Sequence, residues 1–219
     1  MGVSPSAVKA ILVTHDHNDH ISALRVLCKK LRVPIYASCE TLEGIAGICE
    51  LPEHTELVEM SSPAEIAGMY ITPFDTPHDV AHSIGFRLEA GERTVGYATD
   101  LGNVTADVWQ GIVGSDPVVL ESNFEDSMLA VSSYPYFLKQ RIRSDRGHLS
   151  NADCASTLVR LAQSGSTRFI LGHLSQENNS PSVALQAAHM ALGAAGMCEN
   201  RDYILQVARR LLPSEPVML

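Results

Sequence analysis

The sequence predicts a single α+β domain in which helices cover β-sheets. Short apolar runs of strand length alternate along the chain with longer segments whose apolar residues recur at helical spacing. The chain has 219 residues, of which 45% are hydrophobic and 19% charged, which suits one folded domain with a sizeable core. Nothing in the sequence marks a boundary, so we expect residues 1–219 to form one domain.

The predicted strands are the short apolar or alternating runs, at 8–13, 34–37, 55–60, 65–74, 83–88, 94–99, 117–121, 168–171 and 203–207. The turn Ala90-Gly91-Glu92 joins two of them as a hairpin. The predicted helices cover 21–32, 39–49, 105–113, 126–131, 135–143, 151–163 and 182–195. Asn151 is the expected N-cap of the helix at 151–163.

Composition narrows the class of protein. The net charge of −9 argues against a surface coated for nucleic-acid binding, although it leaves room for a local basic site. No stretch approaches the roughly 20 apolar residues that span a bilayer, and the first ten residues lack a signal-peptide layout. The five cysteines are odd in number and scattered, which is typical of reduced thiols in a cytoplasmic protein.

The run His15-Asp16-His17-Asn18-Asp19-His20 follows the first predicted strand directly. Alternate residues of an extended chain point the same way, so His15 and His17 can reach one ion. Asp19 and His20 follow within a helical turn and can reach a second ion beside it. Imidazole and carboxylate ligands suit zinc, manganese or iron. A polar loop with surface histidines is the alternative, and so dense a cluster makes it the weaker one.

The loop cannot complete two coordination shells, so further ligands are expected at other strand ends. His78, Asp100 and His173 each stand just past the carboxyl end of a predicted strand, where sites in mixed α/β folds gather. His82 competes with His78, being four residues further along.

These residues resemble the HxHxDH signature of the metallo-β-lactamase superfamily, in which a lone histidine, a bridging aspartate and a final histidine follow. The resemblance implies the αββα four-layer sandwich of that family and a site for two divalent ions, zinc or manganese. The ligands it implies for one ion are His15, His17 and His78. Those for the other ion are Asp19, His20 and His173, and Asp100 would bridge both.

Later segments are similar to the YycJ/WalJ group of this superfamily, and distantly to tRNase Z, which implies a nuclease. They are 96–102 (GYATDLG), 120–123 (LESN), 147–151 (GHLSN) and 173–179 (HLSQENN). Tyr97 departs from the tRNase Z pattern, which has an acidic residue there to orient the catalytic histidine. Members of the YycJ/WalJ group also carry a Gly-Ser-Ser-Gly-Asn-Ser segment and a strand hairpin ahead of the metal loop.

Here Met1 falls almost directly before the first predicted strand. We therefore expect the first sheet to lack about four strands' worth of residues. An uncovered sheet edge invites association, including homo-oligomers.

Two residues are the expected catalytic groups. Asp19 would orient the attacking hydroxide while it holds a metal, and His148 would stabilise the phosphate or protonate the leaving oxygen. The alternative for His148 is an ordinary loop histidine ahead of a helix. The predicted substrate-binding residues are Ser150, Asn151, Ser175, Asn178, Asn179, Arg143 and Arg146. Turn chemistry explains the serines and asparagines equally well.

Lys139, Arg141, Arg143 and Arg146 place a quarter of the chain's sixteen basic residues in eight positions, beside the expected phosphate loop. They would hold a nucleic-acid backbone, or form an ordinary solvated helix face. The leading hypothesis is a two-metal phosphodiesterase acting on DNA or RNA. The alternatives are a small-molecule hydrolase of the thioesterase or lactonase type, and a metal-bound but inactive interaction domain.

Overall fold

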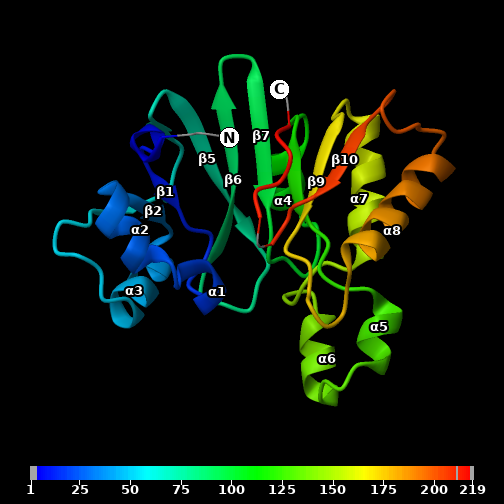
Figure 1. Cartoon of the computed structure of the whole chain (residues 1–219), viewed down its shortest axis with the longest axis horizontal. Helices are drawn as coiled ribbons and strands as arrows, with labels where there is room; N and C mark the ends of the chain where they lie inside the picture. The colour runs from blue at the N-terminus through cyan, green and yellow to red at the C-terminus, as the bar shows by residue number, and fades with distance from the viewer. Residues whose placement is uncertain (1–3, 211, 218–219) are drawn as a thin grey trace.

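Two β-sheets lie face to face in the computed structural model, and helices cover the outer face of each sheet (Figure 1). The structure describes residues 4–210 and 212–217. The four layers are those of the αββα sandwich that the sequence predicts, and a short 3₁₀-helix (Pro5–Ala7) precedes them.

The smaller sheet contains three parallel strands in the order β1 (Ile11–Leu12), β2 (Ile35–Ala37) and β3 (Leu57–Glu59). Its outer face is covered by α2 (Leu24–Leu31) and α3 (Cys39–Ile48), while α1 (Asn18–Ile21) lies beyond the end of β1. Ile21, Leu24, Ile35 and Ile45 pack together between this sheet and its helices. β1 is an edge strand of this sheet, and association through that edge stays a prediction.

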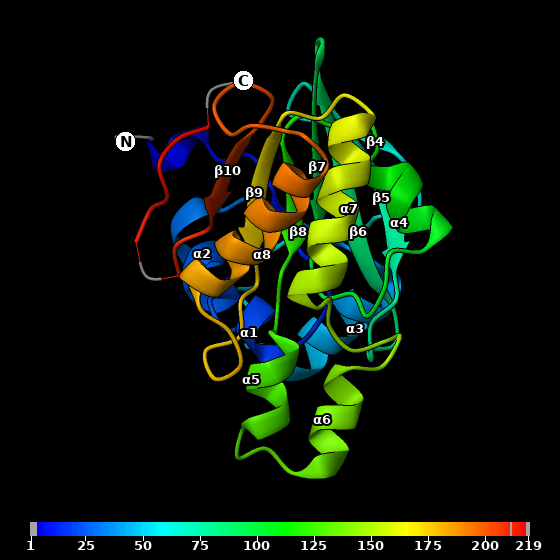
Figure 2. The ribbon, with the colours of Figure 1, turned by 90° about the vertical axis from the view of Figure 1, so that its right-hand side faces the viewer.

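The larger sheet has seven strands in the order β10-β9-β8-β7-β6-β5-β4. They are β4 (Ala64–Ile66), β5 (Met69–Thr76), β6 (Ser83–Ala90), β7 (Arg93–Ala98), β8 (Val118–Glu121), β9 (Arg168–Gly172) and β10 (Ile204–Val207). Pairing is antiparallel from β4 to β7 and parallel from β7 to β10. Three helices cover its outer face, namely α4 (Ala106–Ile112), α7 (Asn151–Gln163) and α8 (Pro181–Ala194) (Figure 2).

Alternation along the strands of the larger sheet divides its side chains between two cores. Leu120 and Phe169 face the outer helices, and both are almost fully buried there. Ile71, Ile84 and Phe86 face the smaller sheet and pack against Leu12 and Tyr36. Because side chains on a strand alternate between its faces, one sheet can supply both layers of core.

Three predictions about local structure were wrong in detail. The strand expected at 65–74 is two strands, because Ala67 (φ 55°) and Gly68 (φ 80°) form a turn between β4 and β5. The helix expected at 21–32 begins at Leu24 as α2, after the separate turn of α1. Ser150, not Asn151, caps α7, since its hydroxyl accepts a hydrogen bond from the Asp153 amide.

Strands β5, β7, β8 and β9 end at the same edge of the larger sheet, and the loop after β1 reaches that edge from the smaller sheet. The fold therefore gathers residues from five separate segments at one place.

Candidate metal centre

The loop after β1 holds its histidines through the hydroxyl of Thr14. That oxygen lies 3.0 Å from Nδ1 of His15 and 3.2 Å from Nδ1 of His20. When both Nδ1 atoms donate to it, the Nε2 atoms of the two rings are left for an ion. Partners of this kind fix the tautomer and orientation of ligating histidines.

His78, Asp100 and His173 lie just past the ends of β5, β7 and β9, as the sequence predicts. Asp100 (φ 60°) and His173 (φ 53°) have left-handed backbone conformations, which are uncommon for residues with a side chain. Such conformations occur where the surrounding structure imposes them, often at functional sites. Here both side chains reach the segment 15–20, since Oδ2 of Asp100 lies 3.3 Å from Nε2 of His20 and Nε2 of His173 lies 3.5 Å from Oδ2 of Asp19.

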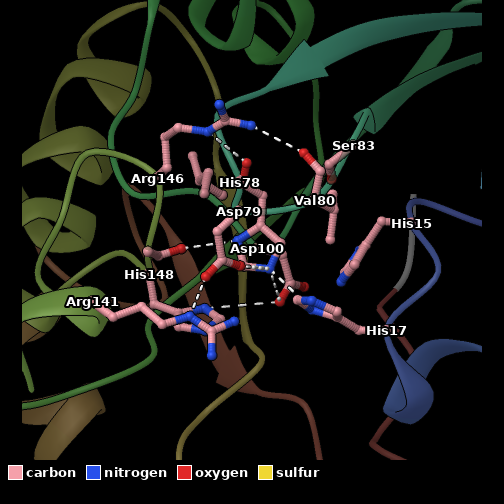
Figure 3. Close-up of polar contacts among 12 residues, drawn as sticks. His15, His17, His78, Asp79, Val80, Ser83, Asp100, Arg141, Arg146 and His148 are labelled. Atoms are coloured by element: carbon pink, nitrogen blue, oxygen red, sulfur yellow. Dashed lines mark hydrogen bonds and ion pairs between the residues drawn. The ribbon is translucent and has the colours of Figure 1, made fainter. Parts of the chain in front are cut away.

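The seven predicted ligands come together in overlapping groups. One group contains His15, His17 and His78, and another contains Asp19, His20 and His173. Asp100 joins them, because it forms a third group with His15 and His20; within each group the ligand atoms lie within 4.8 Å of one another. Figure 3 shows His15, His17, His78 and Asp100 directed toward one point.

Two buried polar atoms indicate that this site fits a cation. Nε2 of His15 makes no hydrogen bond to any described residue, and Oδ2 of Asp100 makes none of good geometry, although Nε2 of His20 lies 3.3 Å from it; both side chains are almost fully buried. A buried polar atom without a partner costs roughly 1–3 kcal/mol. A divalent ion would satisfy both atoms, and mixed imidazole and carboxylate ligands suit zinc or manganese.

The protonation of the site agrees with this fit. Burial lowers the pKa of His15 to about 3, and it also lowers the pKa of His78, so both rings are neutral at pH 7 as metal ligands must be. Burial also acts to raise the pKa of Asp100, but its hydrogen bond with His20 and the nearby histidines outweigh burial and lower it. Asp100 is therefore ionised between the two groups of ligands.

Glu121 is a site residue to which the sequence analysis assigned no role. It ends β8, is fully buried, and accepts hydrogen bonds through Oε1 from Nδ1 of His148 and of His173, each at 2.8 Å. Its Oε2 accepts hydrogen bonds from the backbone amides of Leu101 (2.9 Å) and Leu149 (3.3 Å). These bonds outweigh burial and lower the pKa of Glu121, so the carboxylate stays charged. The signal for it was a lone glutamate at the end of the apolar run 117–121.

Tyr97 stands where tRNase Z has an acidic residue that orients the catalytic histidine. In this chain Glu121, on the neighbouring strand β8, supplies a carboxylate to His148 instead. Burial acts to lower the pKa of His148, but the bond to Glu121 outweighs it and raises that pKa. For His173, bonds to Asp19 and Glu121 likewise outweigh burial and raise the pKa to about 11. Metal binding to His173 must therefore displace a proton.

The predicted substrate-binding residues divide between the cleft and the interior. Ser175 and Asn179 line a cavity of about 1620 Å³ together with Asp19, His148 and His173. Asn151 and Asn179 are bonded to each other in a buried network that includes Ser122. The hydroxyl of Ser150 caps α7. Asn178 is buried, and its backbone amide donates a hydrogen bond to the hydroxyl of Ser175. Substrate binding by these residues stays a prediction.

The basic residues of α6 (Tyr136–Ile142) and the loop after it are tied to the protein itself. Arg146 donates to the carbonyl oxygens of His78 (2.8 Å) and Val80 (3.0 Å), and so supports the loop that carries a ligand (Figure 3). Arg141 pairs with Asp79 beside His78, and Arg143 pairs with Asp126 of α5 (Asp126–Val131). Phosphate binding by Arg143 and Arg146 stays a prediction.

His82 is not a member of the centre. Its Nδ1 lies 3.0 Å from Glu40 of α3 and its Nε2 lies 2.9 Å from Asp75 of β5, so both ring nitrogens are engaged elsewhere. Of the two competing histidines, the structure thus places His78 with the other predicted ligands.

Comparison with known proteins identifies the family. A model of the "Beta-lactamase superfamily domain" matches residues 2–174. This chain belongs to the metallo-β-lactamase superfamily. It is similar to exodeoxyribonuclease WalJ of Streptococcus pneumoniae serotype 2 (strain D39 / NCTC 7466), with 34% identity over 193 residues, 86% of this chain and 70% of that protein. Exodeoxyribonuclease YycJ of Bacillus anthracis is 31% identical over 194 residues, 86% of this chain and 72% of that protein.

Solved structures agree on the metallo-β-lactamase fold. YhfI from Bacillus subtilis superposes with a TM-score of 0.70 at 19% identity, over 95% of this chain and 78% of that one. The short form of human tRNase Z superposes with a TM-score of 0.55 at 16% identity, over 80% of this chain and 75% of that one. This metallo-β-lactamase-fold chain is accordingly an enzyme, a metal-dependent hydrolase. None of the helices in 4–210 and 212–217 is long and apolar enough to cross a membrane.

Proposed function

We propose that this chain is a two-metal phosphodiesterase that acts as an exonuclease on DNA. The observation that carries the proposal is the pair of ligand groups joined by Asp100, together with His148, which lines the same cavity and is held by Glu121. The curated relatives named exodeoxyribonucleases support DNA as the substrate. The chain's own ligand chemistry supports either zinc or manganese.

Two ions, when bound, would supply hydroxide near neutral pH and offset negative charge on the phosphoryl group. The first would be held by His15, His17 and His78, and the second by Asp19, His20 and His173. Asp100 would contribute to both sites. Asp19 lines the cavity and is the more exposed carboxylate of the set, so it is placed to orient the attacking oxygen.

His148 supplies the proton in this proposal. Glu121 engages its Nδ1, which leaves Nε2 of a ring that lines the cavity to act on the substrate. Its raised pKa increases the protonated fraction of the ring at neutral pH. A protonated imidazole at that position can stabilise the phosphate and give its proton to the leaving oxygen.

The test measures metal content and cleavage together. The chain is stripped with chelator, reloaded with Zn²⁺ or Mn²⁺, and assayed on single- and double-stranded oligonucleotides with and without a 5′-phosphate. We expect two ions per chain and release of nucleotides from an end, with cleavage abolished by His17→Ala and retained by His54→Ala. His54 is a matched control because, among the residues that the structure describes, its ring bonds only to the Cys28 carbonyl and does not line the cavity.

Other outcomes would support the alternatives. Ester or thioester hydrolysis without oligonucleotide cleavage would identify a small-molecule hydrolase on the same metal site. Two bound ions with neither activity would contradict the proposal and favour an interaction domain.

A further inference from the structure

Helices α5 and α6 form an arm that projects from the body of the molecule (Figures 1 and 2). We call residues 125–147 the α5–α6 arm. It starts just after β8, which ends at Glu121, and it returns to the body at Gly147 and His148. Both ends of the arm are therefore anchored beside the metal centre.

The arm carries the most exposed large apolar side chains in the described part of the protein. Val131 is 86% exposed, Tyr136 77% and Phe137 73%. Large apolar groups grouped on a surface mark contact sites more often than single ones do. Two of these three are aromatic rings on adjacent residues at the start of α6.

Other residues of the arm line the cavity that contains the metal centre. Tyr134, Leu138, Arg141 and Ile142 contribute to the same wall as His148. Arg141 also pairs with Asp79, next to the ligand His78. Because a helix rises about 1.5 Å per residue, the α-carbons of residues 136 and 137 lie only about 7 Å along the axis from that of Arg141.

Positive charge accompanies the aromatic rings. Residues 136–146 contain four basic residues and one acidic residue, in a chain whose net charge is −9. Lys139 donates to the carbonyl oxygens of Ala130 and Ser132, and Arg146 to those of His78 and Val80. Carbonyl groups do not neutralise a cation, so both charges remain available to a polyanion.

We propose that the α5–α6 arm is a platform for single-stranded DNA, with bases stacked on Tyr136 and Phe137. The proposal rests on the function proposed above. Aromatic side chains beside a basic path are the elements that bind single strands without regard to sequence. The phosphates would follow Lys139 and Arg146 toward the cavity, where the strand end meets His148. The arm would therefore select substrates that have at least a few unpaired nucleotides.

The test uses the metal-loaded enzyme and a single-stranded oligonucleotide with phosphorothioate linkages and one 2-aminopurine, whose fluorescence reports stacking. We expect Tyr136→Ala/Phe137→Ala to raise the Kd by about tenfold or more, because each stacked base contributes that order of affinity. Tyr136→Trp/Phe137→Trp should keep or strengthen binding and quenching. The matched control is Ile48→Ala/Met190→Ala, which removes two equally exposed apolar side chains that do not line the cavity.

Hydrolysis of bis(p-nitrophenyl) phosphate reports the metal site alone, because that diester has no bases to reach the arm. Wild-type binding by the double alanine variant would overturn the arm proposal while diester turnover still supports the phosphodiesterase. A change in sedimentation of the alanine variant with unchanged DNA binding would also overturn it, and would make the arm a protein contact. If the wild-type enzyme does not hydrolyse the diester, the proposed function is rejected, and the binding assay alone then decides whether the arm binds DNA.

Discussion

The two halves of the metal centre reach the same cleft by different routes. One half comes from six consecutive residues, His15 to His20, on the loop after β1 and the start of α1. The other half comes from the ends of β5, β7, β8 and β9, separated by as much as the interval from His78 to His173. The first half is organised by local geometry around the Thr14 hydroxyl, whereas the second depends on strand order and on the buried carboxylate of Glu121.

This comparison predicts that damage to the dispersed half is the more severe. A local loop can be rearranged by its own few residues. A group at a strand end, in contrast, is coupled to several other groups through the sheet. Four substitutions test this difference: two in the dispersed half, one in the local half and one outside the candidate centre.

Asp100→Asn should have the largest effect, because Asp100 is the only carboxylate placed between the two ligand groups by the described residues. Loss of its charge should lower cleavage by about 10³-fold, since metal sites supply several kcal/mol of charge stabilisation. Metal analysis should show fewer than two ions per chain. Asp107→Asn, on the exposed start of α4, is the control. Full occupancy and activity in Asp100→Asn would reject the bridging role.

Glu121→Gln should come next, because the amide keeps the shape of the side chain but removes the anion that accepts from His148 and His173. We expect about a 10- to 100-fold loss of activity or metal affinity, the range for partners of ligating histidines. The alkaline limb of the pH–rate profile should also move to lower pH, since Glu121 raises the pKa of His148. A merely structural role would leave that limb in place. Glu65→Gln on β4 is the control.

Thr14→Val tests the local half, and we expect a smaller loss. Valine has nearly the volume of threonine, but it cannot accept hydrogen bonds from Nδ1 of His15 and His20. Metal affinity should fall by about tenfold, at the low end of the range for such partners. Competition with a chromogenic chelator measures it, with Thr94→Val in the β6–β7 hairpin as the control. A loss larger than that of Glu121→Gln would contradict the comparison between the two halves.

His82→Gln should have the smallest effect, on stability alone. His82 links α3 to β5 through Glu40 and Asp75, and its hydrogen bond with Asp75 raises its pKa above the ordinary 6.5. The raised pKa means that the protonated ring stabilises the fold below about pH 6.5, and that this contribution is lost as pH rises through the folded value. Because His82, Glu40 and Asp75 are partly exposed, the substitution should lower the free energy of unfolding by less than about 1 kcal/mol. Urea unfolding of the wild type and the variant at pH 6 and pH 8 measures this change. The same loss of stability at both pH values would show that the ion pairs of His82 do not contribute.

Local patterns in the sequence predict the layered fold and most residues of the candidate metal centre. Alternating apolar runs and helical spacing are local properties, and they predict the elements that form the two sheets and their covers. The cluster from His15 to His20 is visible because its residues are adjacent, and His78, Asp100 and His173 are visible because each follows a strand. The YycJ/WalJ resemblance carried by the later segments agrees with the relatives now identified.

The residues that hold the predicted ligands in place by hydrogen bonds can be identified only from the tertiary structure. Glu121 meets His148 and His173 only because β8 lies between β7 and β9, an arrangement that no local pattern encodes. Likewise Asn151 and Asn179, which suited substrate binding in the sequence, lie in one buried network because the starts of α7 and α8 are packed together. A residue type indicates which chemistry is available, but the neighbours that set its charge and direction come from strands and helices distant in sequence.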